Sequence, residues 1–194
     1  MTAAASIHAS FGPQTPSKGW TDDALAQLPE GLPYEIEDGR LVVSPSPAFN
    51  HQRICARLLR TLEDQCTAEW WPIHEGDIRI YQDEFAWQLR TPDILIVPRG
   101  LTEADSIRGW AHPHEVPLVI EVVSPSSITV DRMTKVSLYA SWGIPRYLRL
   151  ERKPDVVLYS YVLDQETSQY APPTEHRDVF TTDQPFPLRL DLTS

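Results

Sequence analysis

The sequence predicts an α/β fold in which a mixed β-sheet is flanked by helices. One observation is the apolar run from Val116 to Ser124, which is typical of a central strand buried on both faces. A second is the helical spacing of apolar residues at two places, residues 50–66 and 129–142. The third is their order, because these segments alternate with shorter strand-like runs, and such alternation favours one sheet covered by helices.

The chain has 194 residues, of which 41% are hydrophobic, and this suits one α/β domain with a substantial core. Residues 1–19 contain Ser, Pro, Gly and Thr with little periodic apolar content, so we expect a flexible N-terminal tail. Residues 20–194 are predicted to form a single domain.

A short helix and a β-hairpin are expected at the start of this domain. Thr21 precedes Asp22 and Asp23, and a capping residue followed by acids is typical of a helix start. Asp38-Gly39 stands between two alternating runs and predicts a type I′ turn between two strands.

From Asn50 the period of the apolar residues becomes helical, with Ile54, Leu58, Leu62 and Cys66 at four-residue spacing. The later helix, residues 129–142, is followed directly by stop signals, a glycine and a proline. Further strands are expected at residues 76–81, 85–89, 93–97, 116–124, 147–150, 156–162 and 188–192, with a long loop at 99–117.

Composition limits which binding partners and which cellular compartment can be expected for this protein. The net charge is −10, which counts against a protein that coats nucleic acid but allows brief, local contact with it. No stretch approaches the roughly 18 apolar residues of a membrane span, and Met1–Ser10 lacks the features of a secretory signal. The two cysteines, Cys55 and Cys66, are interpreted as small core residues in a reducing compartment. We therefore expect a cytoplasmic protein that does not enter a membrane.

The candidate site rests on two carboxylates in apolar surroundings. Glu121 stands inside Leu118–Val123, where an unpaired charge would cost several kcal/mol, so it requires a cation or a structural ion pair. Asp93 opens another apolar strand, although an acid at a strand end also suits a turn. Two carboxylates from neighbouring strands can hold a hard cation such as Mg²⁺. By contrast, the motifs typical of nucleotide cofactors, serine hydrolases and structural zinc are absent.

An ordered series of short motifs covers about residues 20–165. Its members are Tyr34-Glu35-Ile36-Glu37-Asp38-Gly39, Asn50-His51-Gln52, Pro92-Asp93, the run from Ile120 to Ser127, Asp131, Lys135, Tyr139, Gly143 and Pro145-Arg146-Tyr147. This series resembles the PD-(D/E)XK nuclease superfamily. Within it, the series is most similar to the putative restriction-endonuclease family that was first catalogued as a domain of unknown function and is abundant in cyanobacteria and actinobacteria.

The resemblance implies a restriction endonuclease-like fold and a role for each matching residue. Asp93 and Glu121 would bind Mg²⁺ (or Mn²⁺), and Glu35 would be an auxiliary acidic residue of the catalytic site. The implied activity is metal-dependent endonucleolytic hydrolysis of DNA phosphodiester bonds. Because many nucleases of the superfamily act as dimers, the resemblance also implies a homodimer.

One position departs from the superfamily pattern. The catalytic lysine usually lies two residues after the glutamate, and here that residue is Val123. The expected substitute is Lys135, which shares a helix face with Asp131 and Tyr139. The alternative is an ordinary surface pair between Asp131 and Lys135, which would stabilise the fold only slightly.

Substrate contacts are predicted on the long helix. His51 can contact phosphate or a catalytic carboxylate, or it can simply be a polar residue at a helix start. Arg53 and Arg57, with Arg60, form a stripe that suits a DNA backbone but also suits a solvated helix face. Besides a nuclease, two functions stay open: a catalytically inactive nuclease-fold module for binding or regulation, and a hydrolase of a small phosphorylated molecule.

Overall fold

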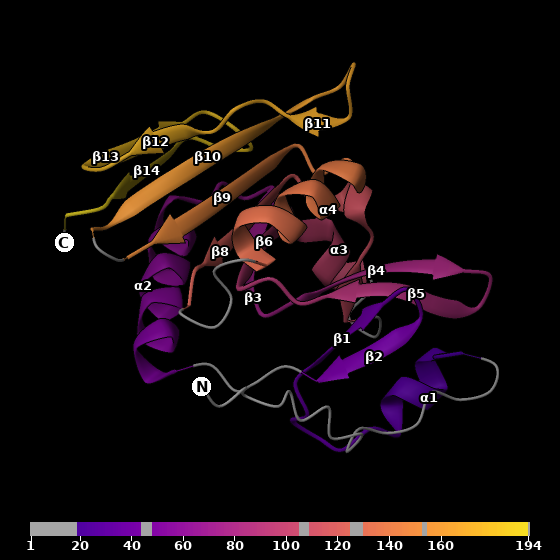
Figure 1. Cartoon of the computed structure of the whole chain (residues 1–194). Helices are drawn as coiled ribbons and strands as arrows, with labels where there is room; N and C mark the ends of the chain where they lie inside the picture. Colours follow the sequence, from indigo (N-terminus) through magenta and orange to yellow (C-terminus); the bar gives the residue numbers. More distant parts are fainter. Residues whose placement is uncertain (1–18, 44–47, 105–108, 125–129, 153–154, 194) are drawn as a thin grey trace, which may run out of the picture. The chain divides into compact units, whose positions relative to one another are not determined.

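The computed structural model describes residues 19–43, 48–104, 109–124, 130–152 and 155–193 (Figure 1). The predicted N-terminal tail thus lies almost wholly outside the described residues. Two compact units are present, and each is described by itself. The smaller unit comprises the described residues of Met1–Ser46 with Tyr81–Leu89, and the larger comprises those of Pro47–Ile80 with Arg90–Ser194.

The smaller unit contains the predicted helix and hairpin. Thr21 caps helix α1 (Asp22–Ala26), since its side-chain oxygen accepts a hydrogen bond from the Ala24 amide at 3.2 Å. Strands β1 (Tyr34–Glu37) and β2 (Arg40–Val43) pair antiparallel. Asp38 and Gly39 join them with φ values of 48° and 73°, and two positive φ angles are the mark of the type I′ turn.

Strand β5 (Phe85–Arg90) pairs with β1 in the same unit, with Ile36 opposite Leu89. The buried residues of this unit come from the start of the chain, from β1 and from β5. They are Trp20, Leu25, Ile36, Ala86 and Leu89. This small apolar cluster anchors the hairpin to α1.

The larger unit begins with the long predicted helix, α2 (Phe49–Gln65). The elements that follow are β3 (Trp70–His74), β4 (Asp77–Gln82, which runs into the smaller unit), β6 (Ile94–Pro98), α3 (Arg99–Ala104), β7 (Trp110–Ala111), η1 (Pro113–Glu115), β8 (Leu118–Val122), the π-helical turn η2 (Val130–Thr134), α4 (Lys135–Ser141), β9 (Arg146–Glu151), β10 (Val157–Asp164), β11 (Gln169–Tyr170), β12 (Thr174–His176), β13 (Val179–Thr182) and β14 (Leu188–Asp191).

A mixed sheet forms the centre of the larger unit. Its order is β11-β10-β9-β8-β6-β3, with β12 also on β10. Strand β8 lies antiparallel to β6, with Ile94 opposite Ile120, and parallel to β9, with Glu121 opposite Arg149. All five residues of β8 are buried, which confirms the central strand predicted from its apolar composition.

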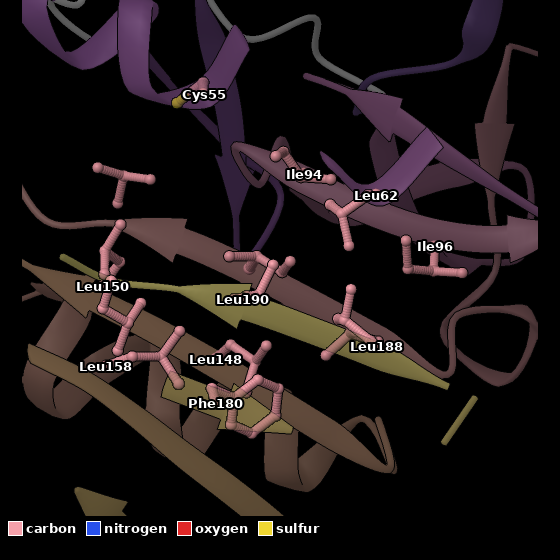
Figure 2. Close-up of a cluster of buried hydrophobic side chains, with 14 of the residues drawn as sticks. Cys55, Leu62, Ile94, Ile96, Leu148, Leu150, Leu158, Phe180, Leu188 and Leu190 are labelled. Atoms are coloured by element: carbon pink, nitrogen blue, oxygen red, sulfur yellow. The ribbon is translucent and has the colours of Figure 1, made fainter. Parts of the chain in front are cut away.

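Helices cover both faces of this sheet (Figure 1). On one face, Cys55 and Leu62 of α2 pack with alternate residues of β6, β8 and β9 and with the β13–β14 hairpin (Figure 2). On the other face, Tyr139 of α4 packs with Val119 and Tyr147. Because side chains alternate along a strand, α2 and α4 cover opposite faces, and the predicted mixed α/β architecture is confirmed.

The structure differs from the prediction at the unpredicted strands β3, β11, β12 and β13 and in two further segments. The stretch 99–117 was expected to be a loop, but its described residues include α3, β7 and η1. The second helix was expected at 129–142, but α4 spans only Lys135–Ser141 and follows the π-helical turn η2. A π-helical turn inserts an extra residue, which the i, i+4 spacing of apolar residues does not reveal. No helix in the described part of the chain is long and apolar enough to cross a membrane.

Candidate metal and catalytic centre

Glu121 is a buried carboxylate in the middle of the sheet. Its side chain is 3% exposed, and it projects from β8 toward α4. The Tyr139 hydroxyl donates a hydrogen bond to its Oε1 at 2.7 Å, and the Lys135 Nζ lies 2.8 Å from the same oxygen. These two contacts offset the free-energy cost of burying the Glu121 charge. Removal of one partner from such a buried pair typically costs about 3–5 kcal/mol.

Asp93 immediately precedes β6 and lies next to Glu121 in the sheet register. Ile94 pairs with Ile120, so one further step along the two antiparallel strands brings Asp93 opposite Glu121. Its Oδ2 accepts a hydrogen bond from the Val122 amide at 2.6 Å. Since that amide belongs to β8, the Asp93 carboxylate is fixed at the start of β6, beside the strand that carries Glu121.

The donor set of these two residues fits a hard divalent cation. Both supply carboxylate oxygens, the ligands that Mg²⁺ and Mn²⁺ prefer, and both project from the same end of two paired strands. Asp93 is 16% exposed, whereas Glu121 is almost fully buried. A cation held by both carboxylates would be accessible to solvent on the side of Asp93.

Lys135 reaches Glu121 from the helix that follows the glutamate strand. It is the first residue of α4, and its side chain is 12% exposed. An ordinary surface lysine would be far more accessible, so the geometry favours the buried pair over the surface pair considered as the alternative. Val123 holds the usual lysine position, and its amide donates to the Leu150 carbonyl at 2.8 Å.

Glu35 belongs to the smaller unit, so its place in the catalytic site stays a prediction. Within that unit, Ile36 is fully buried, and Tyr34 packs against the same apolar cluster. Glu35 therefore lies on the opposite face of β1 from Ile36, as strand alternation requires.

His51 lies in the first turn of α2 and contacts Asp93. Its Nε2 is 2.9 Å from Asp93 Oδ1, so the imidazole helps to hold this carboxylate in place. Cys55, one turn further along α2, completes a group of three metal-ligating atoms that all lie within 4.8 Å of one another. Burial raises the pKa of the Cys55 thiol, and the nearby charges of Asp93, Glu121 and Glu75 raise it further.

Arg53 and Arg57 line a groove of about 320 Å³ in the larger unit. Arg152, after β9, and Arg189, on β14, lie in the same groove, together with one acidic residue, Asp191. The groove is thus locally basic in a chain whose net charge is −10.

A second buried charge network was not predicted from the sequence. Arg149 and Glu151 of β9 are 7% and 8% exposed, and Arg149 Nε lies 3.0 Å from Glu151 Oε1. Arg149 also donates to the Tyr161 hydroxyl at 2.5 Å and lies over the Tyr159 ring. Arg132 binds both oxygens of Glu151, which fixes the π-helical turn η2 to β9 directly before Lys135.

Sequence patterns gave partial signals for the residues that were missed. The i, i+4 spacing of His51 and Cys55 places both on one helix face and could have indicated a pair of metal ligands. The apolar stripe was sufficient, however, to account for Cys55 as a core residue. Arg149 lies in the strand predicted at 147–150, and Glu151 follows it two residues later, just beyond the predicted end; charged residues at that spacing normally indicate a solvent-exposed face.

Comparisons with known proteins agree with this architecture. The family model Uma2, described as a putative restriction endonuclease, matches residues 22–193. Among solved structures, one similar chain is a putative nuclease belonging to DUF820 from Anabaena variabilis. It has 14% sequence identity and a TM-score of 0.62, and the match covers 86% of this chain and 89% of that one. No curated protein sequence gave a match.

The structural likeness shows a shared fold, and the family model spans nearly the whole chain, from α1 to the end of β14. The resemblance seen in the short sequence motifs is therefore confirmed. On this basis, the chain belongs to the Uma2 family of putative restriction endonucleases.

Proposed function

We propose that this protein is a metal-dependent endonuclease that hydrolyses DNA phosphodiester bonds. The observation that carries the proposal is Glu121, a carboxylate kept in the centre of a buried strand with Lys135 at 2.8 Å and Asp93 on the neighbouring strand. Membership of a family described as putative restriction endonucleases supports the same substrate class.

Asp93 and Glu121 would hold Mg²⁺ (or Mn²⁺), which when bound lowers the pKa of a water molecule and offsets charge on the phosphate. His51 fixes the orientation of the Asp93 carboxylate through the contact at 2.9 Å. Tyr139 fixes Glu121 in the same way. Lys135 supplies a positive charge close to the position where negative charge develops on the phosphate oxygens.

The basic groove supports a nucleic-acid substrate. Arg53 and Arg57 follow His51 along α2, so phosphates bound by them would lie along the helix that carries a catalytic-centre residue. Arginine is suited to this role because its planar fork binds phosphate through two hydrogen bonds. The overall negative charge limits binding to this groove and opposes coating of long DNA.

A catalytically inactive module for binding or regulation is the second candidate, and Val123 is the observation that favours it. Without a lysine at that position, stabilisation of the negative charge on the phosphate by a lysine would rest on Lys135. The other lysines of the chain lie outside the described residues.

Cleavage of plasmid and single-stranded DNA in Mg²⁺ and in Mn²⁺ tests the proposal. The wild type should nick or cut DNA, Asp93→Ala should be inactive, and Asp83→Asn, at an exposed turn in the smaller unit, should match the wild type. If the wild type fails to cleave either substrate in both metals while it still binds DNA, the non-catalytic module is the better account.

A further inference from the structure

We propose that His51, Cys55 and Asp93 form a three-ligand site for a thiolate-binding transition metal ion such as Zn²⁺ or Co²⁺. The site shares Asp93 with the proposed hydrolytic centre but does not depend on nuclease activity. Its basis is the position of three ligand atoms in the larger unit: an imidazole nitrogen, a thiol sulfur and a carboxylate oxygen.

Two of the ligands are placed by the period of one helix. His51 and Cys55 are four residues apart on α2, a 17-residue helix, so their side chains project from the same face. The helix packs on the sheet through Cys55 and Leu62, as Figure 2 shows, and the start of α2 lies close to Asp93, directly before β6. The third ligand, Asp93, is fixed independently by the Val122 amide.

The spacing of the three atoms is close to that of a metal site. All lie within 4.8 Å of one another, and His51 Nε2 lies 2.9 Å from Asp93 Oδ1. In a tetrahedral zinc site with Zn–S of about 2.3 Å and Zn–N or Zn–O of about 2.0–2.1 Å, ligand atoms are roughly 3.3–3.6 Å apart. Small side-chain rotations therefore suffice. Three protein ligands also leave a fourth position for water, as in catalytic zinc sites.

The ligand types select the class of metal. Mg²⁺ prefers oxygen ligands throughout, whereas a mixed set of nitrogen, sulfur and oxygen suits Zn²⁺ and Co²⁺. His51 and Asp93 are partly accessible, with 13% and 16% of their side chains exposed, while Cys55 is buried beneath them. A metal can thus enter from the side of the imidazole and carboxylate. The competing explanation is that Cys55 merely fills space in the core.

Titration of the full chain with Co²⁺ under reducing conditions separates the two explanations. A thiolate bound to Co²⁺ gives a charge-transfer absorption band in the near ultraviolet, and this readout requires no DNA. The wild type should develop the band at one equivalent of Co²⁺, and Zn²⁺ should abolish it by occupying the same site. Absence of the band in the wild type would overturn the proposal, whatever the DNA cleavage assay shows.

Two cysteine variants supply a matched comparison, because the chain contains only Cys55 and Cys66. Cys55→Ala should abolish the band, and Cys66→Ala, at the other end of α2, should retain it. If Cys55→Ala does not fold, His51→Gln provides the second test and should weaken Co²⁺ binding at least tenfold, since mutation even of a residue that only orients a metal ligand typically costs about 10–100-fold in affinity. A band that persists in folded Cys55→Ala, or is unchanged in His51→Gln, contradicts the assignment.

Discussion

The Lys135 ammonium lies 2.8 Å from the Glu121 carboxylate, at a point where the glutamate side chain is almost excluded from solvent and the lysine side chain is 12% exposed. The lysine begins α4, whereas the glutamate lies in the central strand β8. This pair links the helix to the sheet and places a positive charge beside the proposed metal ligands. Its removal should therefore affect both stability and catalysis.

Lys135→Met should abolish DNA cleavage and destabilise the protein. The substitution leaves Glu121 buried without its cation, and broken buried pairs typically cost about 3–5 kcal/mol. Lys135→Arg should recover much of the stability, because it restores a positive charge. Ser137→Ala, at an exposed position on the same helix, is the control. Urea denaturation and plasmid cleavage measure the two effects, and near wild-type cleavage by Lys135→Met would remove the lysine from the mechanism.

Tyr139→Phe should be destabilising by about 1.5–3 kcal/mol. The phenol donates a hydrogen bond to Glu121, and hydrogen bonds to charged groups contribute about that much. The ring stays in place, so its packing against Tyr147 and Trp142 is retained. Equilibrium denaturation checks the value, and an unchanged midpoint would show that the hydroxyl does not support the carboxylate.

Glu151→Ala should be much more destabilising than Arg132→Ala. Glu151 is buried and binds both Arg132 and the buried Arg149, so its loss leaves Arg149 without its carboxylate. Arg132 is half exposed, and water can replace much of what it provides. Thermal melting of the two variants gives the order directly. Equal losses of stability would mean that Arg149 does not depend on Glu151.

The Arg53→Ala, Arg57→Ala double variant should bind DNA more weakly at every sequence, with a shallower dependence on salt. Each phosphate contact to duplex DNA contributes about 0.9 to the slope of log K against log salt, so loss of two contacts should reduce the slope by roughly 2. Arg60→Ala is the matched control, since Arg60 is an exposed arginine of α2 that does not line the groove. If Arg60→Ala has an equal effect, the groove is not the DNA-binding surface.

Local rules predicted the elements whose signals lie within a few residues. The Thr21 cap and the Asp38-Gly39 turn follow from backbone geometry and short-range hydrogen bonds, and both occur where expected. Glu121 was visible as a charge within an apolar run, because burial of an unpaired carboxylate is too costly to occur without a partner. These features are encoded locally and need no knowledge of tertiary contacts.

Features that depend on distant partners were not predicted. Strand β3 contains Pro72, which normally argues against a strand, but β3 is at the edge of the sheet, where a missing amide donor is tolerated. Arg149 is buried because Glu151, Tyr159 and Tyr161 surround it, and the two tyrosines reach it only when β10 pairs with β9. Cys55 becomes a candidate ligand only once α2 has docked beside Asp93.

Calorimetric titration with Mn²⁺ tests the central claim, that Asp93 and Glu121 together hold a divalent cation. The Cys55→Ala, Cys66→Ala background should be used, so that thiolate binding does not contribute heat. Mn²⁺ should bind and raise the melting temperature, because a ligand present at about 100 times its Kd stabilises the folded state by about 2.7 kcal/mol. Asp93→Asn in the same background should lose most of the Mn²⁺ affinity and most of the rise in melting temperature. No detectable Mn²⁺ binding at millimolar concentration, or equal binding by Asp93→Asn, would contradict the account.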